Sequence, residues 1–120
     1  MSKQPNETQT FSRSTIPVSI DWRTQGVVNA IKRQGSCGAC SAFSAISSLE
    51  SAIAIKTGQL PYLSEQNLVD CVYSYDMCPI GGWYTDQWNY IQNKNNGKIA
   101  YTSKYKYLSG STGTVIISSF

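Results

Sequence analysis

Two cysteines and a glutamine lie close together in residues 34–40, which read QGSCGAC. Cys40 stands directly before a run of residues with helical periodicity, so its thiol is expected at the N-terminus of a helix. The positive end of a helix dipole favours thiolate over thiol. Gln34 lies six residues earlier, and its side-chain amide offers an N–H donor to a developing oxyanion. These residue types at this spacing predict nucleophilic catalysis by Cys40.

The helix that must position Cys40 is expected over residues 40–57. Apolar residues recur there at the three- and four-residue steps of one helical face. Lys56 in the last turn and Gly58 just after it are typical of a helix end. The predicted face comprises Ala42, Ala45, Ile46, Leu49, Ala52, Ile53 and Lys56.

Residues 34–40 resemble the active-site segment of papain-like (cathepsin-type) cysteine proteases, whose local signature begins with the same four residue types as residues 37–40. Three further segments agree with that family in order and spacing. They resemble the start of the mature enzyme, the second helix of its first lobe and its substrate-binding loop, and are residues 16–23 (IPVSIDWR), 63–71 (LSEQNLVDC) and 78–82 (CPIGG). The resemblance implies an α+β papain-like protease fold, of which this chain carries the N-terminal, mostly helical lobe without the β-rich second lobe.

The resemblance also implies roles for single residues. Cys40 is the expected nucleophile that forms an acyl-thioester, and Gln34 is the expected oxyanion donor. Glycines leave backbone free to pair with an extended peptide, and an aromatic side chain beside them favours an apolar substrate residue. The implied substrate-binding residues are Gly38, Gly81, Gly82 and Trp83.

The chain contains no histidine. In the family, the imidazole that pairs with the thiolate and the asparagine that orients it belong to the second lobe. We therefore expect a cysteine endopeptidase by family and no activity from the 120-residue chain alone. The alternative is a pseudoprotease lobe that acts as a binding or decoy module. Three features favour it: the missing histidine, Ser41 in place of the Trp or Tyr of the family, and a loop at residues 78–82 that is one residue longer.

The four cysteines allow several arrangements. By the resemblance, Cys37 pairs with Cys78, and the family partner of Cys71 follows a Tyr-x-Tyr segment like residues 105–107. No cysteine follows that segment here, so Cys71 is expected to be unpaired. Judged without the family, a redox pair or a zinc site is disfavoured by the lack of a βαβ pattern and by the cysteine spacing. An inert buried thiol at Cys40 stays open.

Composition indicates a globular chain, with 41% hydrophobic and 14% charged residues. The net charge of +3 is spread thinly and predicts no nucleic-acid surface. No run approaches the roughly 18 apolar residues of a membrane span, and no metal or other cofactor is expected. The expected partners are a peptide or protein substrate, a propeptide or cystatin-like inhibitor, and the second lobe. The family implies a lysosomal or extracellular location, although no signal peptide is visible.

The chain is expected to divide into three parts. Residues 1–15 form a flexible stub that resembles the end of a propeptide, and residues 16–108 form the first lobe. Residues 109–120 are rich in Ser, Thr and Gly and resemble nothing in the family, so we expect an atypical tail that is truncated or misjoined.

Shorter elements and two core residues are also predicted. Ser64 is expected to cap a second helix that ends at Cys71. A third helix, capped by Thr85 or Asp86, is expected to run to about Asn93. A turn is expected at residues 95–97 and a strand over residues 101–108. Buried tryptophans are expected at Trp22 and Trp88.

Overall fold

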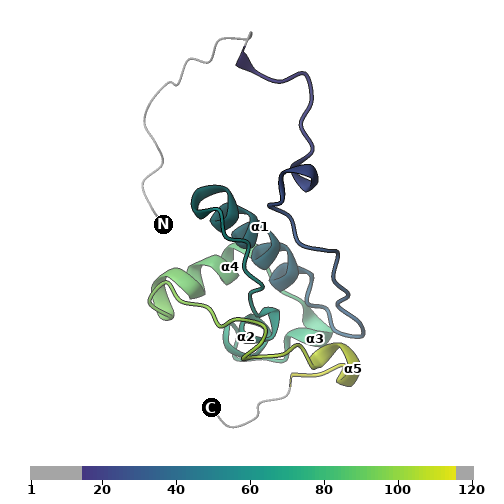
Figure 1. Ribbon diagram of the computed structural model, residues 1–120. Helices are drawn as coiled ribbons and strands as arrows, with labels where there is room; N and C mark the ends of the chain where they lie inside the picture. Colours follow the sequence, from purple (N-terminus) through teal and green to yellow (C-terminus); the bar gives the residue numbers. More distant parts are fainter. Residues whose placement is uncertain (1–14, 116–120) are drawn as a thin grey trace.

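The computed structural model describes residues 15–115 as a group of helices joined by long loops (Figure 1). Among these residues, β-pairing is limited to one antiparallel bridge between Leu63 and Tyr101, so the strand predicted over residues 101–108 is wrong. The chain leaves that bridge in a turn and does not run beside a second strand. The elements in chain order are a 3-10 turn Trp22–Gln25, α1 Cys40–Thr57, α2 Glu65–Cys71, α3 Met77–Ile80, α4 Tyr84–Asn89, a π-helical turn Tyr90–Lys94 and α5 Ser109–Thr112.

Helix α1 begins and ends where the sequence predicts. Gly58 follows it with a φ of 79°, and its N–H donates to the carbonyl of Ala54 at 2.9 Å. This left-handed residue ends the helix because glycine carries no Cβ to oppose that conformation. The buried face differs from the prediction, since Ala52 and Lys56 are exposed while Glu50 is buried. The inner face of α1 therefore carries an acidic side chain that hydrophobic periodicity does not detect.

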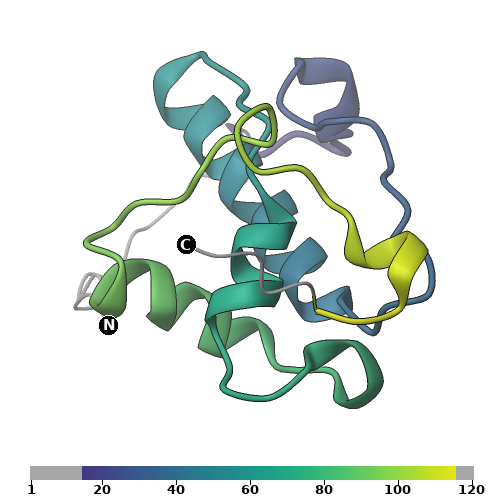
Figure 2. The same cartoon turned by 90° about the horizontal axis from the view of Figure 1, so that it is seen from below.

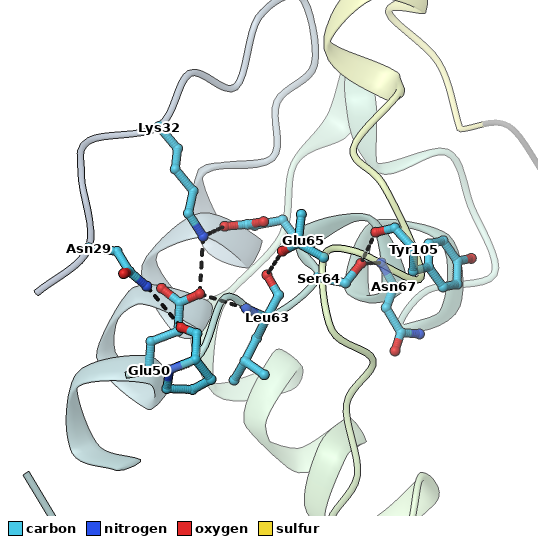
Figure 3. Close-up of polar contacts among 10 residues, drawn as sticks. Asn29, Lys32, Glu50, Leu63, Ser64, Glu65, Asn67 and Tyr105 are labelled. Atoms are coloured by element: carbon cyan, nitrogen blue, oxygen red, sulfur yellow. Dashed lines mark hydrogen bonds and ion pairs between the residues drawn. The ribbon is translucent and has the colours of Figure 1, made fainter. Parts of the chain in front are cut away.

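Helix α2 lies near the centre of the lobe and packs against α1 (Figure 2). Ser64 caps it as predicted: its Oγ accepts from the N–H of Asn67 at 3.0 Å and donates to the carbonyl of Tyr105 at 2.7 Å. Residues 65–69 are all buried. A single hydroxyl thus supplies the N-cap and also holds the segment that returns along α2 (Figure 3).

A buried ion cluster joins the N-terminal segment to α1 and α2 (Figure 3). Lys32 Nζ lies 3.1 Å from Glu50 Oε2 and 2.6 Å from Glu65 Oε2, and Glu50 Oε2 also accepts from the N–H of Leu63 at 2.7 Å. Burial alone would lower the pKa of Lys32, but hydrogen bonds and charge attraction from the two carboxylates outweigh it and raise that pKa. The cluster thus links Lys32 to α1 and α2 through two ion pairs.

Helix α4 begins at Tyr84 after the N-cap Trp83, two or three residues earlier than the predicted cap at Thr85 or Asp86, and the π-helical turn extends it to Lys94. The expectation that Trp88 and Trp22 belong to the core is wrong, because they are 39% and 47% exposed. Gln87 occupies the inner side of α4 and is completely buried. The ring of Trp88 lies at the edge of α1, where its Nε1–H donates to the carbonyl of Ala45 at 3.3 Å.

Residues 15–31 form an arm that contains the 3-10 turn. Its first residues extend away from the helices, whereas its last residues run back beside α1, where Asn29 Nδ2 donates to the carbonyl of Pro61 at 2.9 Å (Figure 1). Apolar side chains alternate along it and are largely exposed to solvent: Ile16, Val18 and Ile20. An extended segment with apolar side chains at every second position is typical of a strand whose partner lies elsewhere.

Candidate active site

Cys40 is the first residue of α1, and its thiol is free and exposed. The preceding residue, Ala39, is fully buried and occupies the N-cap position of the helix. Cys37 is bonded to Cys78, as the resemblance implied, so Cys37 and Cys40 do not form a redox pair. The alternative of a buried thiol at Cys40 is also wrong, because Cys40 is exposed. Of the two cysteines in the motif, Cys40 alone keeps a thiol that a substrate can reach.

The disulfide fastens the loop before α1 to α3, across a sequence separation of 41 residues. Gly38 lies between its two ends: its N–H donates to the carbonyl of Cys78 at 2.9 Å. A Cβ at Gly38 would lie 2.8 Å from that carbonyl oxygen, so a larger residue would push the two segments apart. Gly38 is therefore placed beside the bridge, two residues from the thiol of Cys40.

Gln34 lies in the same loop, and its side chain is anchored there. Its Nε2 donates to the carbonyl of Cys37 at 2.8 Å. A primary amide carries two N–H donors, so one of them stays available for another acceptor. The structure thus places a fixed amide donor and a free thiol at the two ends of one seven-residue segment.

The predicted substrate-binding residues Gly81, Gly82 and Trp83 follow α3 directly. Gly81 has a φ of +83°, which a side chain would strain. A Cβ at Gly82 would come within 2.5 Å of the ring of Tyr73, so only glycine lets the backbone pass over that ring. Trp83 is 66% exposed. Backbone without a side chain and an exposed aromatic ring therefore lie next to each other.

Tyr73 supports this segment and was not recognised in the sequence. Its hydroxyl accepts from the N–H of Trp83 at 2.8 Å and donates to Asp86 at 2.7 Å. Burial and the carboxylate of Asp86 raise the pKa of Tyr73 to about 12. The hydroxyl therefore stays protonated at neutral pH and links the loop to α4.

Ser41 and Gln87 form a polar pair directly beside Cys40. Ser41 is buried, and its Oγ accepts from Gln87 Nε2 at 3.1 Å. Gln87 reaches α1 from α4, and its Oε1 has no hydrogen-bond partner among the described residues. A polar pair thus occupies the space between the two helices beside Cys40, where the family resemblance predicted a large aromatic ring.

Residues 107–115, here termed the strap, run beside the loop that precedes α1 (Figure 2). Gln66 Oε1 accepts from the N–H groups of Leu108 at 2.7 Å and Ser109 at 3.0 Å. At the far end, Asp76 accepts from the Thr114 hydroxyl and from the Val115 N–H. The described part of the predicted tail is therefore bonded to the lobe at both ends. Residues 1–14 and 116–120, which include most of the predicted stub and the end of the tail, lie outside the described residues.

Cys71 has a free thiol, as expected from the cysteine count. It is half-buried, and its Sγ accepts from Asn67 Nδ2 at 3.5 Å. Burial and the neighbouring Cys71 raise the pKa of Tyr90 to about 12. Cys71 therefore provides an internal reference for the reactivity of Cys40, since the two free thiols differ in exposure.

No helix within residues 15–115 is both long and apolar enough to cross a membrane.

Comparison with known proteins agrees with this geometry. Residues 16–116 match the family model described as papain family cysteine protease. Cathepsin S from Mus musculus is 45% identical over 82% of this chain and 29% of its own length, and ananain from Ananas comosus is 42% identical over 84% and 29%. A solved structure of bromelain from Ananas comosus with the E64 inhibitor is 41% identical, with a TM-score of 0.70 over 78% of this chain and 42% of that one.

The chain therefore belongs to the papain family of cysteine proteases, and its fold is the helical N-terminal lobe of that family. It spans less than half the length of the relatives named above.

Proposed function

We propose that this chain is the nucleophile-bearing lobe of a papain-like cysteine endopeptidase. The single observation that carries the proposal is the free, exposed thiol of Cys40 at the first position of α1, beside a cysteine that is locked in a disulfide. In this role the Cys40 thiolate attacks a peptide carbonyl and forms an acyl-thioester. The backbone N–H of Cys40 and the remaining N–H of the Gln34 amide stabilise the oxyanion.

The substrate of this lobe would be an extended peptide. A Cβ at Gly38 or Gly82 would meet the Cys78 carbonyl oxygen or the Tyr73 ring, so these glycines let the two loops pack closely. By the family resemblance, the main chain of the loop at Gly81 and Gly82 would pair with an extended peptide. Trp83 is exposed beside these glycines and offers an apolar surface to a substrate side chain. These contacts support peptide binding through main-chain hydrogen bonds with a preference for apolar residues.

The chain by itself is expected to be inactive, because it contains no histidine to accept the thiol proton and protonate the leaving amine. The arm at residues 15–31 supports a second, β-rich lobe as partner, since its alternating apolar side chains lack cover. A propeptide or cystatin-like inhibitor would occupy the same groove as the substrate. We also propose a lysosomal or extracellular location, as expected for the family.

A binding or decoy module is the second candidate. The observation that favours it is the Ser41–Gln87 pair, which replaces an aromatic residue directly beside the nucleophile. A protein of this kind would hold an inhibitor or propeptide without cutting it. Its binding would not depend on the thiol of Cys40.

The direct test is labelling of the chain with an epoxysuccinyl inhibitor of cysteine proteases, followed by intact mass across pH 4–9. We expect one label on Cys40, none on the Cys40→Ala variant, and the same labelling of the Cys71→Ser variant. The chain should hydrolyse a fluorogenic peptide no faster than Cys40→Ala does. If Cys71 is labelled as much as Cys40, or if Cys40 is not labelled, the assignment of Cys40 as the nucleophile is wrong. Equal binding of a cystatin by the chain and by Cys40→Ala, without labelling, would favour the binding module.

A further inference from the structure

The strap is hydrogen-bonded to the loop of Gln34 at two positions. The N–H of Ser36 donates to the carbonyl of Gly110 at 2.8 Å, and the hydroxyl of Tyr107 donates to the carbonyl of Gln34. The ring of Tyr107 also packs edge-on against Phe43 of α1, with the centroids 5.0 Å apart. The strap therefore contacts the main chain at Gln34 and Ser36.

Two glycines face each other where the strap crosses this loop. A Cβ at Gly35 would lie 2.5 Å from the carbonyl oxygen of Gly110, and Gly35 also has a φ of +65°. A Cβ at Gly110 would lie 2.7 Å from the ring of Tyr107 and 3.0 Å from the carbonyl oxygen of Gln34. The backbones therefore approach so closely that a movement of the strap must move the loop.

Gln66 fixes the strap from the other side. It is 2% exposed, and its Oε1 accepts both strap N–H groups described above. Its Nε2 donates to Ser109 Oγ at 2.8 Å and to Asp70 Oδ1 at 2.7 Å. The oxygen and the nitrogen of the Gln66 amide are therefore both hydrogen-bonded. The side chain satisfies backbone N–H groups of the strap, as the main chain of a neighbouring strand would.

We propose that Tyr107 and Gly110, held in place by Gln66, are positioning residues for the oxyanion donor Gln34. This inference rests on the proposed function, because it assigns a purpose to the strap only if the Gln34 amide meets an oxyanion. The Gln34 side chain bonds to its own loop at Cys37, so its direction depends on where the loop backbone lies. An oxyanion donor acts through its preorganised position, and a shift of the loop weakens it without removing it.

The test uses the complete chain and the peptide aldehyde acetyl-Phe-glycinal, labelled with ¹³C at the aldehyde carbon. The Cys40 sulfur bonds to that carbon, the C=O π bond breaks, and the thiol proton ends on the oxygen, which gives a thiohemiacetal. The dissociation constant of this adduct, read by NMR, reports stabilisation of the oxygen and needs no histidine. Alkylation of Cys40 by iodoacetamide serves as a parallel measure of the thiol alone.

We expect Gln34→Ala to raise the dissociation constant about tenfold, as for loss of one net hydrogen bond. Tyr107→Phe removes only the hydroxyl and should raise it about threefold, and Gly110→Ala should raise it at least as much. In the Gln34→Ala background, Tyr107→Phe should have no further effect. Ser111→Ala, on the exposed side of the strap, is the matched control and should change nothing.

The results separate the two proposals. If Gln34→Ala weakens the adduct but Tyr107→Phe and Gly110→Ala do not, the positioning role is wrong and the role of Gln34 stands. Effects of Tyr107→Phe that persist in the Gln34→Ala background, or that equally slow iodoacetamide, also overturn it. If Gln34→Ala has no effect, or no adduct forms on Cys40, the proposed function itself fails.

Discussion

Around Lys32, two carboxylates are almost fully buried and share one ammonium group, whereas around Cys40 the thiol and the Trp83 indole are exposed. The cluster at Lys32 joins three segments by charge-assisted hydrogen bonds. The edge at Cys40 is held instead by a disulfide, by glycines in close backbone contact and by the strap.

This difference has a physical reason. A buried carboxylate must be paired, because an unpaired charge in the interior is very costly. A nucleophile must meet its substrate, so it cannot be enclosed by partners within its own lobe. The lobe stabilises the edge around Cys40 through the backbone and covalent bonds and leaves the Cys40 thiol and the Trp83 side chain exposed. The predictions below test this division.

The largest effect is expected at the cluster. Glu50→Ala removes an acceptor for both Lys32 and the N–H of Leu63. The free energy of unfolding should fall by up to about 5 kcal/mol, because breaking a buried pair leaves its partners unsatisfied. Urea unfolding measures this change. The control is Arg23→Ala, which breaks the exposed pair with Asp21 and should cause no resolvable loss. A Glu50→Ala loss as small as that of the control would contradict the cluster's role.

The disulfide should come next. Replacement of Cys37 and Cys78 by serine should destabilise the lobe by about 4 kcal/mol, as the loop-closure model gives for this separation. Thermal and urea unfolding of the double variant test this expectation. Cys71→Ser leaves the bridge intact and serves as the control. If the double variant is as stable as the control, the stability of the edge around Cys40 does not depend on the covalent bond.

A smaller effect is expected at the cap of α2. Ser64→Ala should cost about 1–2 kcal/mol, because the N–H of Asn67 loses its acceptor and the carbonyl of Tyr105 loses its donor. Ser48→Ala is the matched control, since the Ser48 hydroxyl bonds only to carbonyls of its own helix. Equal losses in the two variants would mean that the cap does not connect α2 to the returning segment.

The smallest effect is a pH dependence at the end of the strap. The Thr114 hydroxyl above all, and the N–H groups of Cys78 and Val115, hold the pKa of Asp76 below its ordinary value. A lowered pKa means that this contact stabilises the fold above the unfolded-state pKa and is lost as the pH falls through the folded-state pKa. The Val115 amide shift, followed by NMR, should be constant at pH 5–7 and change below about pH 4.

The Asp76→Asn variant should lack this transition. A midpoint near pH 6 in the unchanged chain would exclude Asp76 as the group responsible. Either result shows whether the strap is held at this end by charge or by packing alone.

Much of the helical framework could be predicted from the order of the residues. The bounds of α1, the N-cap at Ser64 and the unpaired Cys71 follow from local periodicity, capping chemistry and a count of cysteines. The Cys37–Cys78 bridge came from the family resemblance. These features depend on neighbours within one or two turns, or on a pattern that relatives share, so they can be read without coordinates.

The tertiary structure alone decided the features that join distant segments. Lys32 meets Glu50 and Glu65 over separations of 18 and 33 residues, and Tyr107 meets Gln34 over 73. No periodicity marks such pairs, because their contacts depend on how α1, α2 and the strap pack. For the same reason the sequence does not show that Gln87 is buried on the inner side of α4 and that Trp88 is exposed. The sequence by itself determined that Cys40 begins its helix, and packing decided what holds the loop of Gln34 in place, since a loop has no preferred position until other segments contact it.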